Sequence, residues 1–192
     1  MSINNLSVEE LGQLFPIILS EPKPDWISIY KKEEKEIIAI IGKDNIDRIE
    51  HIGSTAVPGL ISKPTIDILL EVKNKLKNKF LINSLKSIHY QYIPKPENPP
   101  PHMMFAKGYT EQGFKGQAYH IHVRYLGDWD ELYFRDYLII HSEIAKKYGK
   151  LKQELAKKYR NNREAYTEAK TEFINRINTL ARKKLINGKS KY

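Results

Sequence analysis

The chain has 192 residues, a formal net charge of +9 and no cysteine. A chain of this length can bury one core, so we expect a single domain over residues 1–192. The missing cysteine excludes disulfides and thiolate metal sites and favours a reducing, cytoplasmic compartment. Its apolar stretches are shorter than the roughly 20 residues of a membrane span, and the first residues lack a signal-peptide pattern, so we expect no membrane partner.

The positive charge is concentrated toward the C-terminus. Residues 1–140 hold 17 Lys+Arg against 18 Asp+Glu, whereas residues 141–192 hold 15 against 5. A basic segment of this kind can attract nucleic acid, nucleotides or acidic partners. A solvated, lysine-rich helix face explains the same composition without any partner, and both interpretations stay open.

The first 52 residues predict two helices and a strand. Ser7 to Glu10 fit a capping box that opens a short helix, which Pro16 should bend or shorten. Apolar residues recur at helical spacing from Pro24 to Gly42, which predicts an amphipathic helix closed by that glycine. A first strand is expected over residues 46–52.

The centre of the chain predicts the rest of a sheet. Residues 65–72, TIDILLEV, are apolar on both faces, which is typical of a strand in the middle of a sheet. Helical spacing follows over residues 75–88, then a short strand at YQYIP. Two further strands, HMMFAKGY and AYHIHVRYL, are joined by EQGFKG as a hairpin.

After Trp129 the pattern is helical throughout. The sequence therefore predicts an α/β (α+β) fold. A small mixed sheet of four or five strands, flanked by helices, should occupy about residues 25–128. A C-terminal helical segment should occupy residues 129–187.

The turn between the two first strands suggests an anion site. Backbone N–H groups at Gly53, Ser54 and Thr55 can converge on a phosphate. On the next strand, an ionised Asp67 is costly to bury unless a donor, a cation or a metal lies beside it. A phosphate cradle beside a metal-ligating oxygen is the arrangement that phosphoryl transfer needs. The alternative is a structural Asp67 that caps a turn or pairs with Lys63.

His120 and His122 alternate on a later strand and should therefore point to the same face. Together with Asp67 and Glu50 they could offer nitrogen and oxygen ligands to a divalent metal. They could equally contact phosphates or act as acid and base near neutral pH. Arg124 follows on the same face, where a guanidinium can contact phosphate. Half-buried histidines with structural partners remain the alternative.

Residues 50–72, EHIGSTAVPGLISKPTIDILLEV, closely resemble the signature of the GrpB family, a group of largely uncharacterised bacterial proteins. The likeness continues through HIHVR and the FRDYL and YGKLKQELA segments, from about Trp26 to Phe173. The resemblance implies the fold of the DNA-polymerase-beta-like nucleotidyltransferases. Their hallmark is Gly-Ser after a first strand and two alternating aspartates on the next. On this likeness Gly53 and Ser54 match the turn and Asp67 matches the first carboxylate.

The second carboxylate of that hallmark is missing, because its position holds Leu69. Glu71 is not a simple substitute. It lies four residues from Asp67, about 13 Å along a strand, whereas paired metals lie about 4 Å apart. For Glu50, a salt bridge to Arg48 or Lys63 is the alternative to metal binding.

We therefore expect a nucleotidyltransferase-like protein that binds a nucleotide or another phosphorylated small molecule, with Mg²⁺ or another divalent metal. The predicted catalytic residues are Asp67, His120 and His122. The predicted phosphate-binding residues are Gly53, Ser54, Thr55, Lys63 and Arg124, and the predicted metal ligands are Asp67, Glu50, His120 and His122. As an enzyme it would transfer nucleotidyl groups by in-line attack. The alternatives are an inactive binding module and an RNA-binding accessory protein that uses the basic C-terminal helices.

Overall fold

The computed structural model describes residues 7–189 of the chain. Its helices are α1 (Val8–Leu14), α2 (Trp26–Ile41), α3 (Asn78–Ser87), α4 (Asp130–Ile140), α5 (Ser142–Lys158), α6 (Arg163–Glu168) and α7 (Thr171–Lys189). Its strands are β1 (Ile46–Ile52), β2 (Thr65–Val72), β3 (Gln91–Pro94), β4 (Met103–Thr110) and β5 (Gly113–Arg124). Two short 3-10 helices, η2 (Lys43–Asn45) and η3 (Ser54–Ala56), flank β1. The predicted mixed α/β fold is confirmed.

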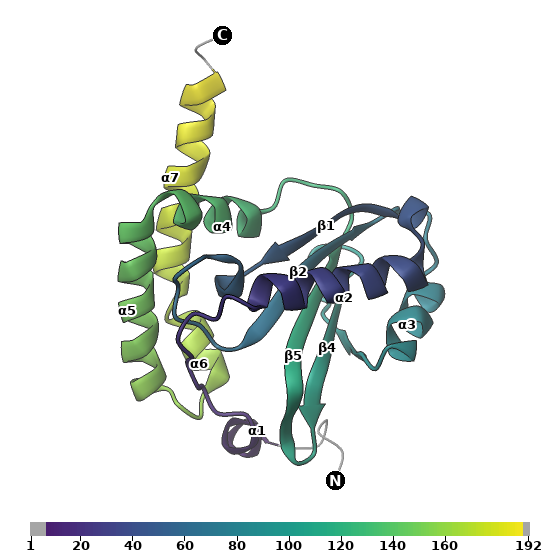
Figure 1. Ribbon diagram of the computed structural model, residues 1–192, viewed down its shortest axis with the longest axis horizontal. Helices are drawn as coiled ribbons and strands as arrows, with labels where there is room; N and C mark the ends of the chain where they lie inside the picture. The colour runs from purple at the N-terminus through teal and green to yellow at the C-terminus, as the bar shows by residue number, and fades with distance from the viewer. Residues whose placement is uncertain (1–6, 190–192) are drawn as a thin grey trace.

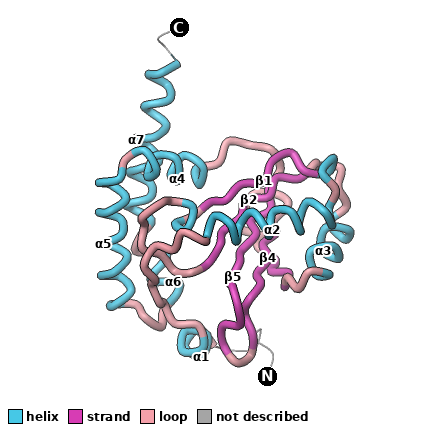
Figure 2. Tube along the Cα trace, viewed as in Figure 1, coloured by secondary structure: helices cyan, strands magenta, loops and turns pink. Residues whose placement is uncertain are grey.

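The five strands form one sheet in the order β1-β2-β5-β4-β3 (Figures 1 and 2). Only β2 and β5 run parallel, and the other neighbouring pairs are antiparallel. The predicted place of TIDILLEV inside the sheet is confirmed, since β2 pairs on both sides. Every residue of β2 is buried except Asp67, because the strand is covered by structure on both faces.

One face of the sheet packs against α2 and α3. Alternate residues of β2, such as Ile66, Ile68 and Leu70, enter this apolar core together with Ile37 of α2 and Leu81 of α3. The intervening residues Asp67, Leu69 and Glu71 must project from the opposite face, because side chains alternate along a strand. The candidate site therefore lies on the face away from α2.

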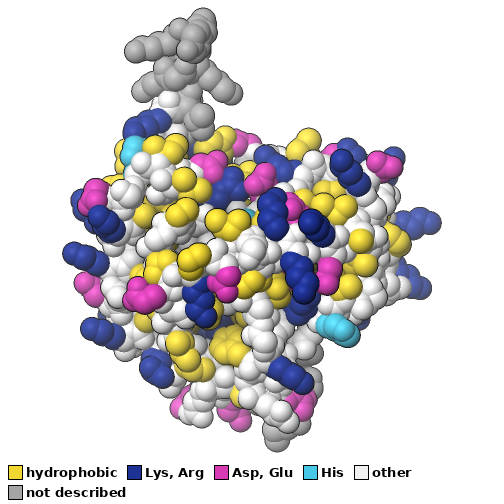
Figure 3. Space-filling model, in the orientation of Figure 1, with side chains coloured by type: hydrophobic (Ala, Val, Ile, Leu, Met, Phe, Trp, Pro, Cys, Tyr) yellow, Lys and Arg dark blue, Asp and Glu magenta, His cyan; other side chains and the backbone are white. Residues whose placement is uncertain are grey.

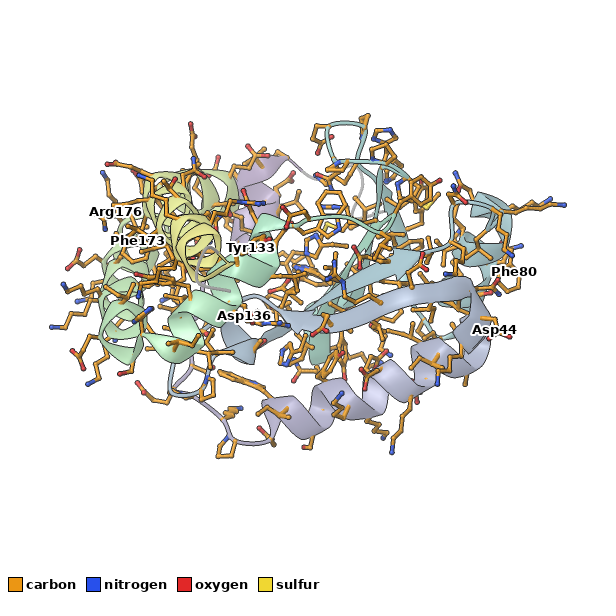
Figure 4. All side chains as sticks on the ribbon, turned by 90° about the horizontal axis from the view of Figure 1, so that it is seen from above. Asp44, Phe80, Tyr133, Asp136, Phe173 and Arg176 are labelled. Carbon is orange, nitrogen blue, oxygen red and sulfur yellow. The ribbon has the colours of Figure 1, made fainter. Side chains whose placement is uncertain are left out.

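The four C-terminal helices gather at one end of the sheet. Figure 4 shows Phe173 and Arg176 of α7 beside Tyr133 of α4, with Asp44 and Phe80 at the far end of the molecule. A second apolar cluster holds these helices to the loop between β1 and β2, with Val57 and Leu60 packing against Tyr148. Within the described part of the chain, no helix has the length and apolar character needed to cross a membrane.

Local sequence signals predicted the start and the end of α1. Ser7 and Glu10 form the predicted capping box, and α1 ends before Pro16. The hairpin prediction was wrong in its loop length, because β5 already begins at Gly113, which pairs with Thr110. The positive φ of +100° at Gly113 permits this tight turn.

Candidate functional site

Asp67 is the polar exception in a buried strand. Its side chain retains 28% of its accessible surface, whereas its neighbours Ile66 and Ile68 are fully buried in the core behind it. The carboxylate therefore projects from the face opposite α2 and can be reached from solvent.

His120 and His122 lie beside Asp67 because β5 runs parallel to β2 with Asp67 opposite His120. Nδ1 of His120 is 3.1 Å from Oδ1 of Asp67, a hydrogen-bond distance. Nε2 of His122 is 3.7 Å from the same oxygen. One ligand atom from each of the three residues falls within 4.8 Å of the others, close enough to hold one metal ion. The predicted same-face projection of the two histidines is confirmed.

Both ring nitrogens of His120 have a hydrogen-bond partner. Arg163 donates through Nη2 to the hydroxyl of Tyr109 at 3.4 Å, and this hydroxyl lies 2.8 Å from Nε2 of His120. If the hydroxyl donates to Nε2, then Nδ1 carries the ring proton and donates it to Asp67. Burial lowers the pKa of His120, which agrees with a neutral ring. Burial alone would raise the pKa of Asp67, but the hydrogen bond from His120 and the nearby His122 hold it well below its usual range.

The Gly53 turn lies directly over the carboxylate. Ile52 is paired with Asp67 across β1 and β2, and Gly53 follows with a φ of +71°. A Cβ built on Gly53 would come within 2.6 Å of Oδ2 of Asp67. Only glycine therefore fits here, for both conformation and space. The turn and the acid face each other.

Ser54 and Thr55 differ in how far their side chains are already engaged. A hydrogen bond links Ser54 to Tyr148, whose pKa is raised by burial. The buried hydroxyl of Thr55 donates to the carbonyl of Thr65 at 3.0 Å and accepts from Nε2 of His51 at 3.0 Å. The Thr55 hydroxyl is thus part of the fold and is not available to an anion.

Lys63 is near enough for the charge of Asp67 to act on it, whereas Glu50 and Arg124 are not brought into the site. Glu50 pairs with Arg135 at 2.8 Å, instead of the expected Arg48 or Lys63. Arg124 is 4% exposed and donates through Nη1 to the carbonyl of its neighbour Val123 at 2.9 Å. It shares a face with His120, but four residues along a strand separate them by about 13 Å.

The remaining positions on this face of β2 carry no second metal ligand. Leu69 is fully buried. Glu71 is also fully buried, and its carboxylate accepts hydrogen bonds from Arg48, from the backbone N–H of Gly127 at 2.9 Å and from Nε1 of Trp129 at 2.6 Å. Glu71 is therefore a structural anion that anchors the loop before α4.

Three basic residues near the site were missed from the sequence: Lys152 of α5, Arg163 at the start of α6 and Lys170 before α7. Lys152 is only 2% exposed. Burial lowers the pKa of Lys152 to about 6 and that of Lys170 to about 8, and the charge of Asp67 opposes both shifts. Burial likewise lowers the pKa of Lys63 to about 7. A signal for Lys152 existed, since it continues the buried stripe of Ala145, Tyr148 and Gly149 at helical spacing.

Comparison with known proteins identifies relatives across most of the chain. The family described as GrpB protein matches residues 16–179. A UPF0157 protein of Pseudomonas aeruginosa is 39% identical over 156 residues, which are 80% of this chain and 63% of that protein. The glutamate-rich protein GrpB of Alkalihalophilus pseudofirmus is 34% identical over 165 residues, 84% of this chain and 93% of that protein.

The fold is also similar to a solved structure. The crystal structure of the conserved protein GrpB from Enterococcus faecalis matches with a TM-score of 0.76 and 31% sequence identity. The match covers 88% of this chain and 99% of that one. The chain thus spans under two thirds of the Pseudomonas relative and nearly all of the Enterococcus protein.

Proposed function

Since this chain belongs to the GrpB family, we propose that it is a nucleotidyltransferase-like protein that binds a nucleotide or another phosphorylated small molecule. One observation carries the proposal. The Gly53 turn packs directly on Asp67, which in turn contacts two histidines from the neighbouring strand. An amide-lined turn beside a metal-capable acid is the arrangement by which proteins hold a phosphate and a metal together.

The donor set fits one divalent metal at Asp67, His120 and His122. Two imidazole nitrogens and one carboxylate suit Zn²⁺, Mn²⁺ or Fe²⁺ better than Mg²⁺, which prefers oxygen ligands. When bound, such an ion supplies positive charge that polarises a phosphoryl oxygen. With Nδ1 of His120 on the metal, the ring proton would move to Nε2 and be donated to the Tyr109 hydroxyl, the kind of outer partner that metal-bound histidines have. Arg163 would hold that hydroxyl in place.

The buried Leu69 favours a second candidate, a binding module without two-metal chemistry. Glu71 does not restore the missing ligand, because its carboxylate is committed to Arg48, Gly127 and Trp129. Nucleotidyl transfer would therefore depend on a single metal. A measurement of pyrophosphate release from nucleoside triphosphates with Mn²⁺ separates the enzyme from the module.

The test of the metal site is thermal unfolding with Mn²⁺, Zn²⁺ and Mg²⁺, each with and without ATP. We expect Mn²⁺ or Zn²⁺ to raise the melting temperature of the wild type, because a ligand that binds the folded state stabilises it. Asp67→Asn should abolish that rise while keeping the fold, since its amide oxygen still accepts from His120. The matched control is Asp44→Asn, an exposed acid at the far end of the molecule (Figure 4).

Two outcomes contradict the metal site. The first is a metal-dependent rise of equal size in Asp67→Asn and in the wild type. The second is the absence of any rise with all three metals while ATP alone still stabilises the protein, which would leave the binding module.

An RNA-binding role through the basic helices is the third proposal. Figure 3 shows lysine and arginine side chains interspersed with acids on the visible face, without a continuous basic patch. A steep salt dependence of affinity for single-stranded RNA would support this role. A cytoplasmic location, expected from the cysteine-free composition, stays a prediction.

A further inference from the structure

Four cationic side chains from separate segments surround the region beside Asp67. Lys63 precedes β2, Lys152 lies on α5, Arg163 begins α6 and Lys170 lies between α6 and α7. The sheet supplies the acid and the imidazoles, whereas the C-terminal helices supply most of these cations.

The shared neighbours of these cations show that they converge. The amines of Lys63 and Lys170 both lie over the ring of Tyr166, at 5.6 and 4.4 Å from its centre. The two amines are therefore at most 10.0 Å apart. Nζ of Lys152 is 3.4 Å from the hydroxyl of Ser62, the residue before Lys63.

The positive charges repel one another. The charges of Lys63 and Lys170 both disfavour protonation of Lys152. Arg163 acts in the same direction on Lys63 and on Lys170. All four cations therefore share one electrostatic environment.

This cluster lacks the anions that buried cations normally have. Among the residues that the structure describes, the one negative charge acting on the three lysines is that of Asp67. That carboxylate is already engaged by His120 and His122. Lys152 has a single hydrogen-bond acceptor, the Ser62 hydroxyl, for an ammonium that can donate three. A buried amine without a counterion tends to lose its proton at a cost to stability, and a bound anion would restore its charge and offset that cost.

We propose that Lys63, Lys152 and Lys170 form a binding site for a short polyphosphate chain, such as a nucleoside triphosphate tail or inorganic triphosphate. Three amines and a nearby guanidinium call for a ligand with several negative charges close together, which a phosphate chain provides. Lys152 is nearly inaccessible, so the end of a slender ligand fits better than a nucleic-acid backbone. The inference deepens the proposed function, on which it rests for placing the ligand beside Asp67.

The test is calorimetric titration of the full chain with inorganic triphosphate at pH 7 in EDTA, so that metal plays no part. We expect the wild type to bind, and Lys152→Met to bind at least about tenfold more weakly. The matched control Lys147→Met, on the exposed side of the same helix, should bind like the wild type. Asp67→Asn should bind as tightly or more tightly, because it removes a nearby negative charge.

Two further ligands identify the source of the phosphate chain. ATP binding more tightly than inorganic triphosphate indicates a nucleotide, whereas equal affinity indicates a site for the phosphate chain alone. Inorganic monophosphate should bind more weakly than triphosphate. If Lys152→Met does not fold, as judged by circular dichroism, Lys170→Gln takes its place and should show the same loss.

The proposal is overturned if the lysine variants bind triphosphate like Lys147→Met, if monophosphate binds as tightly as triphosphate, or if single-stranded RNA displaces triphosphate while ATP does not. Its failure is distinguishable from that of the proposed function. Triphosphate binding that depends on Lys152, without any metal effect at Asp67, refutes the metal site alone. A metal effect at Asp67, with triphosphate binding indifferent to Lys152, refutes the lysine site alone.

Discussion

Replacing Lys152 with methionine should stabilise the ligand-free protein. Lys152 is 2% exposed, and burial together with the charges of Lys170 and Lys63 lowers its pKa from the ordinary 10.5 to about 6. Each pKa unit corresponds to about 1.4 kcal/mol, so holding the amine neutral at pH 7 costs at most about 5 kcal/mol. Methionine keeps most of the apolar volume without this cost. We expect a gain of about 1–4 kcal/mol in the free energy of unfolding, as for other buried charges replaced by apolar groups.

The gain should depend on pH in a defined direction. Between the folded pKa of about 6 and the unfolded pKa of 10.5, unfolding takes up a proton on Lys152, so wild-type stability falls as the pH falls. Lys152→Met lacks this proton uptake. Its advantage over the wild type should therefore grow by about 3 kcal/mol from pH 8.5 to pH 6.5. Lys63, Lys170 and Asp67 face the same region and remain in both proteins, so their own titrations largely cancel in the difference.

The assay is urea unfolding followed by circular dichroism at pH 6.5, 7.5 and 8.5. Lys147→Met is the control, and its difference from the wild type should stay small and flat with pH. The reasoning is refuted if Lys152→Met is less stable than the wild type at pH 7, or if its advantage does not grow as the pH falls.

Three other substitutions test residues that hold the turn and loops around the site in place, and each is measured by urea unfolding. Gly53→Ala should lower the free energy of unfolding by about 1–3 kcal/mol, because its φ of +71° suits only glycine and a Cβ would collide with Asp67. Unchanged stability would contradict this. Glu71→Gln should lose about 3 kcal/mol, because it leaves Arg48 without its anion; a loss under about 1 kcal/mol would refute a structural Glu71. Trp129→Phe should lower the free energy of unfolding by about 2 kcal/mol through the missing hydrogen bond to Glu71, and unchanged stability would show that this bond contributes nothing.

The sheet could be predicted because its signals are local. An apolar run in TIDILLEV indicates a covered strand, and a period of two puts His120 and His122 on one face. Local signals do not determine the register, which is the pairing of residues between neighbouring strands. Asp67 meets His120 only because β2 and β5 run parallel with these residues opposite each other, 53 positions apart in the chain. That contact depends on the whole topology, which the period of the sequence does not determine.

Sharing a face was not sufficient to share a site. Arg124 and Glu50 project from the same side of the sheet as Asp67, yet each lies further along its strand and has partners of its own. The reverse holds for Lys152, which was missed because a lysine on a helix is usually solvated. Its position on the stripe of Tyr148 buries it, because α5 packs against the loop between β1 and β2, and this packing overrides the preference of a charge for water.

Two ionisable groups at otherwise apolar positions, Lys152 and Asp67, lie near each other, and this proximity argues for a ligand. Lys152 could be replaced by an apolar residue that packs as well, and Asp67 interrupts an otherwise buried strand. Burying the Lys152 amine costs stability, whereas the two histidines hold the charge of Asp67, and the two groups are near enough for the charge of Asp67 to act on Lys152. Groups held at a cost to the fold are expected where charge is needed for binding or chemistry. A site whose acid comes from the sheet and whose amines come mostly from the C-terminal segment is complete only when the two parts pack together.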